Sequence, residues 1–198
     1  MSEHQINKLS QKLTSLISIV ALILWIQTPL FAANLTNETQ CEIIREALYS
    51  ESPAKQFLLL EKRKIDLNQL CDYPWGGSFA AFPPLVYAVR TLGFSTIKAI
   101  VESGADANLP DEYGMTPIMA ARDLATVQFL LKSRVDVNRQ DENGWTPLMW
   151  HATSGSNEAI QIIKELMRAG AKRNIRNKEG KTAAELAGDN ELRRLLIS

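Results

Sequence analysis

The chain contains few of the residues from which catalytic and metal sites are built. After the first 33 residues it has one histidine, His151, and its two cysteines are Cys41 and Cys71. No Cys/His cluster has the spacing of metal ligands, and the isolated pair Gly76-Gly77 is not a phosphate-binding loop. A Cys-His nucleophile pair would need one of the cysteines beside His151. We therefore predict no catalytic residue, no metal and no cofactor, expect a structural role for His151, and do not expect an enzyme.

An excess of charge of one sign is also absent. The 198 residues include 22 basic and 22 acidic side chains. No surface field is therefore expected to attract nucleic acid or an anionic membrane. The shares of hydrophobic residues (45%) and charged residues (22%) are those of an ordinary globular protein.

The longest hydrophobic run lies near the N-terminus. Residues 1–12 are polar and carry two lysines, residues 16–26 are apolar without a charge or a proline, and Pro29 precedes two alanines. This order is typical of a secretory signal, so residues 1–33 are predicted to be a signal peptide that directs the chain to the periplasm or out of the cell. The alternative is an uncleaved anchor at residues 13–33, which would hold the chain in the inner membrane, facing the periplasm. We expect contact with a membrane only through that anchor.

Both cysteines belong to the part of the chain that is predicted to be exported. In an oxidising compartment Cys41 and Cys71 can form a disulfide, which would close a loop of roughly 30 residues. The sequence does not supply the distance between the two residues. Two unpaired cysteines that lie too far apart to bond are therefore the alternative.

A short segment of the chain is written three times. DEYGMTPI at 111–118 returns as DENGWTPL at 141–148 and, less closely, as NKEGKTAA at 177–184. The glycines of these copies are 30 and 36 residues apart, so their mean spacing is 33 residues. A period of this size indicates one supersecondary unit that is copied and stacked, and neighbouring copies then bury each other's apolar faces.

The repeated residues resemble the ankyrin repeat. Each unit has Thr-Pro-Leu or a variant of it at the start of a helix, an apolar second helix, and an ending such as Gly-Ala-Asp-x-Asn at 104–108. The resemblance covers residues 83–198, as three repeats and a truncated C-terminal cap that begins at Thr182. It implies an all-α solenoid of helix-turn-helix units with protruding turns, and a protein-binding function rather than catalysis.

The copies also differ from the family pattern. From the first Thr or its equivalent to the last Asn the three repeats take 26, 23 and 29 residues. Repeat two is expected to lack the turn between its helices, at Arg122-Asp123-Leu124. Repeat three is expected to carry its extra residues at 153–157 or in a longer second helix. Met119 and Met149 replace the family's histidine, and Arg134 stands where a capping glycine belongs.

Residues 34–82 are predicted to form an N-terminal capping repeat and a connector. Helices are expected at 38–48 and 53–61, and Lys64-Ile65-Asp66-Leu67-Asn68 echoes the ending of the other repeats. The connector at 69–82 is expected to be a long loop, which is either functional or an insertion whose Trp75 packs onto the cap.

The turns supply the candidate binding residues. The acidic pairs Asp111-Glu112 and Asp141-Glu142 occupy the same position in their turns, which indicates solvated turns rather than a general acid and base. The resemblance implies that turns and helices line a concave face for another protein, and aromatic, Met and Arg side chains are enriched at such interfaces. Alternatively, Met115 and Trp145 simply cover each other. The predicted partner-binding residues are Glu112, Tyr113, Met115, Arg139, Glu142, Asn143 and Trp145.

Two functions follow as hypotheses. The first is an exported protein-interaction module, for which an immunity-type inhibitor of a toxic envelope enzyme is the sharper version, by analogy. The second is a membrane-anchored scaffold of an envelope complex. The sequence does not identify the protein partner.

Overall fold

The computed structural model describes residues 36–52, 60, 64–75, 78–154 and 158–197. The predicted signal or anchor, and nearly all of the predicted helix at 53–61, lie outside the described residues. Residues 37–198 form one compact unit. Its elements, in chain order, are α2 (Asn37–Leu48), β1 (Cys71–Trp75), β2 (Ser78–Phe82), α4 (Pro84–Thr91), α5 (Phe94–Glu102), α6 (Pro117–Ala120), α7 (Leu124–Leu131), α8 (Pro147–Thr153), α9 (Ala159–Arg168), α10 (Ala183–Leu186) and α11 (Asn190–Ile197).

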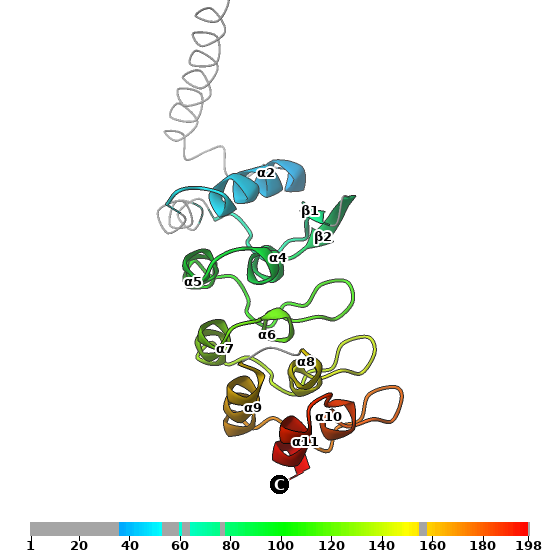
Figure 1. The fold of residues 1–198 in the computed structure, drawn as a ribbon. Coiled ribbons are helices and arrows are strands. Elements are labelled where there is room, and N and C mark those ends of the chain that lie inside the picture. The colour runs from blue at the N-terminus through cyan, green and yellow to red at the C-terminus, as the bar shows by residue number, and fades with distance from the viewer. Residues whose placement is uncertain (1–35, 53–59, 61–63, 76–77, 155–157, 198) are drawn as a thin grey trace, which may run out of the picture. The chain divides into compact units, whose positions relative to one another are not determined.

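From α4 onward the helices pair and stack in two layers (Figure 1). The first helices of successive units, α4, α6, α8 and α10, contact one another, and α5, α7 and α9 form the second layer. The core lies between units. Leu85, Ile118 and Leu148 of the first layer are at most 1% exposed, because stacking covers the face that a single helix pair would leave wet.

The Thr-Pro pairs start the first helices as predicted. Thr116 and Thr146 are N-cap residues with extended backbone, and each following proline occupies the first turn, where its missing N–H costs no hydrogen bond. Met119 and Met149 are buried, and their Sδ atoms accept hydrogen bonds from the backbone N–H of Thr116 and Thr146 at 3.5 Å. The buried methionine side chains therefore help to cap the N-termini of these helices.

An asparagine ends each unit and ties it to the next. The Oδ1 atom of this asparagine accepts a hydrogen bond from a backbone N–H of the following unit. The donor lies two residues before the equivalent asparagine of that unit. All three bonds are 2.7 Å long: Asn68 with Asp106, Asn108 with Asp136, and Asn138 with Lys172. Because Asn68 takes part, residues 64–68 end a repeat-like unit.

A residue with positive φ lies four positions before each of these asparagines and before Asn174, the equivalent asparagine of the third repeat. Glycine occupies it at Gly104 (φ 100°) and Gly170 (φ 93°), but Lys64 has φ 57° and Arg134 has φ 54°. The prediction that Arg134 occupies the position of a capping glycine is therefore confirmed. A side chain in this left-handed region costs about 1–2 kcal/mol relative to glycine.

The expectation that repeat two lacks its inter-helix turn is wrong. The chain leaves α6 at Ala121 in extended backbone, and α7 begins at Leu124 after the N-cap Asp123, whose Oδ1 accepts the Thr126 N–H at 2.8 Å. What is shortened is the first helix. α6 has 4 residues, whereas α4 has 8 and α8 has 7.

In repeat three, α9 is longer than its counterparts, with 10 residues against 9 in α5 and 8 in α7.

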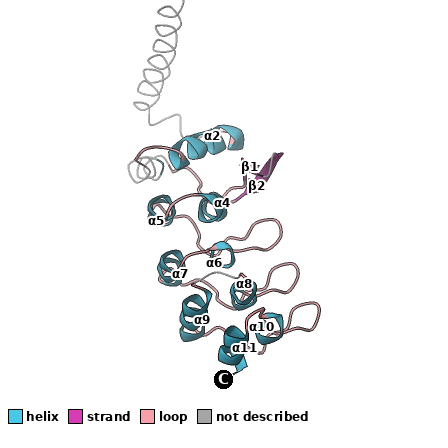
Figure 2. Ribbon diagram, viewed as in Figure 1, coloured by secondary structure: helices cyan, strands magenta, loops and turns pink. Residues whose placement is uncertain are grey.

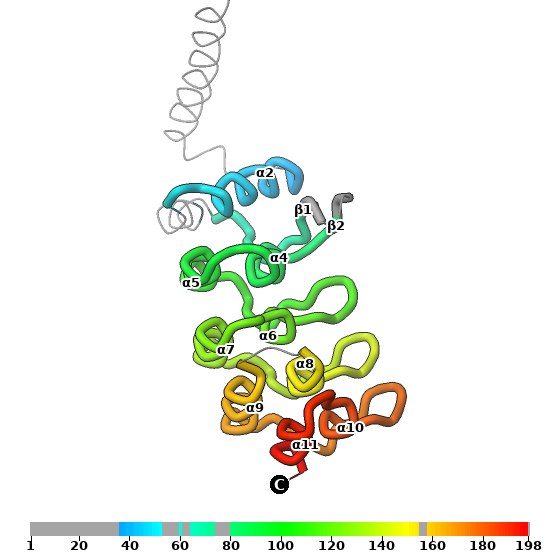
Figure 3. The backbone as a smooth tube through the Cα atoms, in the orientation of Figure 1, coloured from blue at the N-terminus to red at the C-terminus, as the bar shows by residue number. Residues whose placement is uncertain are grey.

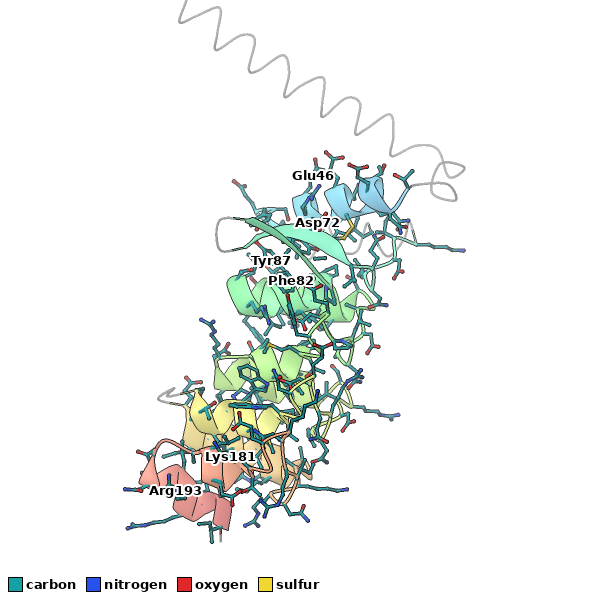
Figure 4. The ribbon with its side chains drawn as sticks, turned by 90° about the vertical axis from the view of Figure 1, so that its right-hand side faces the viewer. Glu46, Asp72, Phe82, Tyr87, Lys181 and Arg193 are labelled. Atoms are coloured by element: carbon teal, nitrogen blue, oxygen red, sulfur yellow. A yellow bond between two sulfur atoms is a disulfide. The ribbon has the colours of Figure 1, made fainter. Side chains whose placement is uncertain are left out.

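The connector is not a loop but an antiparallel β-hairpin, which the all-α prediction did not include (Figure 2). Cys71 pairs with Phe82 and Trp75 with Ser78, so only Gly76-Gly77 separates the strands. Tyr73 is fully buried because its ring stacks on Tyr87 of α4, with 4.1 Å between the ring centres. Figure 4 shows Phe82 of β2 near the same tyrosine, at 6.4 Å between ring centres. The packing of Trp75 lies outside what the structure describes.

A disulfide joins the hairpin to α2. Cys41 of α2 and Cys71 of β1 are bonded through their Sγ atoms, and Arg45 Nη1 donates to the backbone oxygen of Asp72 at 3.0 Å. The bridge closes a loop over a sequence separation of 30 residues. It therefore holds the N-terminal unit on the hairpin and, through the hairpin, on α4.

Arg134→Gly should stabilise the protein by about 1 kcal/mol, because it relieves the left-handed strain at a modest entropic cost. Gly104→Ala should destabilise it by a similar amount, since a Cβ there meets nothing within 4 Å and only φ matters. Urea unfolding measures both. Equal stability of the Arg134 variant and the wild type would contradict the expected strain.

Reduction of the Cys41–Cys71 bridge should cost about 3–4 kcal/mol, on the chain-entropy account of a loop of this length. The effect should be local, because stacked repeats contact only their neighbours. Hydrogen exchange with and without a reductant should show faster exchange in α2, β1 and β2 and little change in α10 and α11. A Cys41→Ala/Cys71→Ala variant, which should not respond to the reductant, is the control. Uniform loss of protection along the chain would contradict this expectation.

Candidate functional site

One side chain organises each protruding turn. Asp111 Oδ1 accepts the backbone N–H groups of Tyr113 (3.0 Å) and Met115 (2.9 Å). Asp141 Oδ1 does the same for Asn143 and Trp145, both at 2.8 Å. At the third turn Asn177 Oδ1 accepts from Glu179 (3.0 Å) and Lys181 (2.9 Å). The same bond pattern gives the three turns one shape, which the tube in Figure 3 shows as three similar loops.

The prediction of solvated acidic pairs is confirmed for Glu112 and Glu142, which are exposed, but is wrong for Asp111 and Asp141. Asp111 is 5% exposed and Asp141 is 8% exposed. The second oxygen of Asp111 pairs with Arg90 Nη2 at 3.1 Å, and that of Asp141 accepts the Trp150 Nε1 hydrogen at 2.9 Å. Charged groups with this many donors are held in place, so both aspartates are structural.

Neighbouring turns are bonded to one another through their backbones. The Glu142 N–H donates to Tyr113 O, and the Lys178 N–H donates to Asn143 O, each at 3.0 Å. The turns approach so closely that a Cβ on Gly114 would lie 2.9 Å from Asp141 Cα. Glycine is thus required at 114 both for this approach and for φ of 79°. The result is a row of rigid turns.

We call the seven predicted binding residues the turn surface. Tyr113 is 60% exposed. Met115 and Trp145 are half-buried. The remaining members are exposed, and they are Glu112, Arg139, Glu142 and Asn143.

Met115 and Trp145 have separate contacts of their own. Met115 Sδ lies 2.8 Å from Arg90 Nη2. The Trp145 ring packs on Trp150 of α8, with 5.1 Å between the ring centres. Each side chain is therefore partly used to attach its turn to a first-layer helix.

Tyr113 lies among acidic side chains. The charge of Glu112, a hydrogen bond with Glu112, and the charges of Asp111 and Glu142 all raise the pKa of its hydroxyl. The hydroxyl therefore stays neutral at physiological pH, and its oxygen can accept a hydrogen bond from a partner.

His151 is 2% exposed, and its Nε2 donates to the backbone oxygen of Ile118 at 2.9 Å. Burial lowers the pKa of the imidazole below its ordinary value of 6.5, which favours the neutral form of His151 at physiological pH. Among the described residues, no three His, Cys, Asp or Glu side chains are grouped so that they could hold a metal ion. Within that same part of the chain, no helix is long and apolar enough to cross a membrane.

A groove of about 490 Å³ lies beside the short helix α6, and sequence reasoning missed it. Arg90, Arg122, Trp150 and His151 are among the residues that line it. Of the predicted residues only Met115 reaches it. The one signal in the sequence was the 23-residue length of repeat two.

Stacked helix pairs with an asparagine bond between units define a helical repeat protein. The family model for ankyrin repeats (3 copies) matches residues 120–198, so this part of the chain is similar to ankyrin repeats, which supports an ankyrin repeat protein. Residues 83–108 precede the match, yet they share the left-handed residue at 104 and the bond from Asn108 to the next unit. The comparison with curated proteins found no match.

The buried His151 should make stability depend on pH. The folded pKa lies below the ordinary value of 6.5, so the unfolded chain binds the extra proton first. Stability should therefore be full above pH 6.5 and fall as the pH drops towards the folded pKa, at up to about 1.4 kcal/mol per pH unit. Urea unfolding at pH 7.5, 6.5 and 5.5 measures this. His151→Gln should lack this slope, and identical slopes in both proteins would contradict the assignment.

Proposed function

We propose that this ankyrin repeat protein is an exported interaction module that binds another protein through its turn surface. Ankyrin repeats generally mediate protein–protein interaction. The observation that carries the choice of surface is Tyr113, a large ring left 60% exposed, whose own backbone N–H and oxygen are both hydrogen-bonded. Tyrosine is enriched among the residues that dominate binding energy.

The rigidity of the turns supports this proposal. Binding costs less free energy when the surface does not have to be ordered first. The Asp111 and Asp141 side chains and the bonds between turns already order the backbone under Tyr113 and Asn143. Glu112 and Glu142 beside Tyr113 favour a partner with a basic residue at this point.

Export to the periplasm or out of the cell is part of the proposal. Residues 1–33 have the order of a secretory signal. The Cys41–Cys71 disulfide is of a kind that persists in oxidising compartments. Within that setting, the sharper proposal is an immunity-type inhibitor that occupies a toxic enzyme of the envelope. A rigid row of turns on a small exported chain suits such a blocking role.

The test is binding of the full chain, recovered from the exported fraction, to the partner that it captures there. Tyr113→Ala should weaken binding by tenfold or more, which is about 1.4 kcal/mol. Phe94→Ala removes a ring that is 42% exposed in the second layer, and it should leave binding unchanged. Equal losses in the two variants, or no protein partner at all, would overturn the proposal.

The proposed inhibitor role makes a separate prediction about cell survival. Cells that express the chain should survive an envelope toxin that the purified chain binds, whereas the Tyr113→Ala variant should protect them poorly. Tight binding without protection would reject the inhibitor role and leave the interaction module in place.

A further inference from the structure

The shortened helix of repeat two creates a hollow in the first layer. α6 ends after 4 residues, while its neighbours α4 and α8 continue for 8 and 7. The groove of about 490 Å³ lies here, and Ala120 and Ala121 at the end of α6 form part of its wall. Small side chains and missing helical turns leave space that the longer repeats fill with their own residues.

Two guanidinium groups line this groove. Arg90 is fixed, because it pairs with Asp111 at 3.1 Å and lies over the Phe82 ring at 4.9 Å from its centre. Burial is the main cause that lowers the pKa of Arg90, and the charge of Arg122 lowers it further. Arg122 is exposed, and within the described part of the chain no hydrogen bond or ion pair engages it.

The nearby carboxylates do not neutralise Arg122. The Asp111 carboxylate binds Arg90 and accepts two backbone N–H groups. The Asp141 carboxylate accepts the Trp150 indole N–H and two backbone N–H groups. Asp123, next in sequence, caps α7 through its Oδ1, and Glu158 Oε2 accepts the backbone N–H of Leu124. The excess positive charge of the groove is therefore that of Arg122.

The rest of the wall combines an apolar part with the polar side chains of His151, Thr153 and Ser154. Trp150, Met119 and Met115 line it together with the two alanines, and Trp150 is held by the bond from its Nε1 to Asp141. An open guanidinium at the edge of an aromatic and thioether wall matches a carboxylate next to an apolar side chain.

We propose that the groove binds an acidic side chain, Asp or Glu, of the partner protein, with Arg122 as the group that receives the carboxylate. This inference rests on the proposed function, since it assumes a protein partner, and it adds a second contact point to the turn surface. The planar guanidinium can bind both oxygens of the carboxylate, which a lysine cannot do.

The experiment is the selection of linear dodecapeptides from a display library by the full chain, followed by calorimetry. Selected peptides should share an Asp or Glu beside an apolar residue, and replacing that acid by its amide should weaken binding by tenfold or more. Arg122→Glu should also cost tenfold or more, and Arg122→Lys less. Lys132→Glu makes the same charge change in the same repeat, at the exposed end of α7, and should have no effect.

Peptides without a shared acid, or acidic peptides that bind the wild type and the Arg122→Glu variant equally, would overturn the groove proposal. Competition by inorganic phosphate with no preference for the acidic peptide over its amide would also overturn it. Circular dichroism of each variant, with Arg122→Gln as a milder change, separates loss of binding from loss of fold. Binding that depends on Tyr113 but not on Arg122 would leave the proposed function intact, whereas no binder to the wild type would count against both.

Discussion

The structure depends on hydrogen bonds that cross from one repeat to the next. Asn68, Asn108 and Asn138 each accept a backbone N–H of the following unit at 2.7 Å. The turns add backbone bonds of their own at Tyr113 and Asn143. These bonds set the spacing at which the apolar helices are stacked. A helix pair without its neighbour would lose both the bonds and the burial, so the units are stable only as an array.

The same spacing explains why the turns are rigid and why α6 leaves a groove. Turns that touch must have glycine at the point of contact, and Gly114 and Gly144 each sit 2.9 Å, at the Cβ position, from the next turn. Gly180, on the third of the three turns, meets nothing within 4 Å. Since the asparagine bonds hold the units at a common spacing, a shortened first helix cannot be compensated by closer stacking. Its missing turn becomes the hollow that Arg122 borders.

Much of the fold could be predicted because its signals are local and repeated. The starts at Thr116 and Thr146 and the left-handed Arg134 follow from neighbours along the chain. The hairpin had a signal too, since Gly76-Gly77 between two short apolar runs is typical of a two-residue turn. The absence of a regular alternation and the presence of Pro74 obscured it. For the site, exposure of Tyr113 could be expected from its place in a turn, but the contacts of Met115 and Trp145 could not.

By itself the sequence determined the repeat, the helix starts, the turn glycines and the asparagines that close each unit. These depend on conformations and hydrogen bonds within a few residues, which recur whenever the letters recur. Only the tertiary structure decided that Asp111 and Asp141 are buried, that Cys41 meets Cys71, and that a groove opens beside α6. Those outcomes depend on which distant side chains the stacking brings together and how well they fill the space between layers. No periodicity along the chain contains that information.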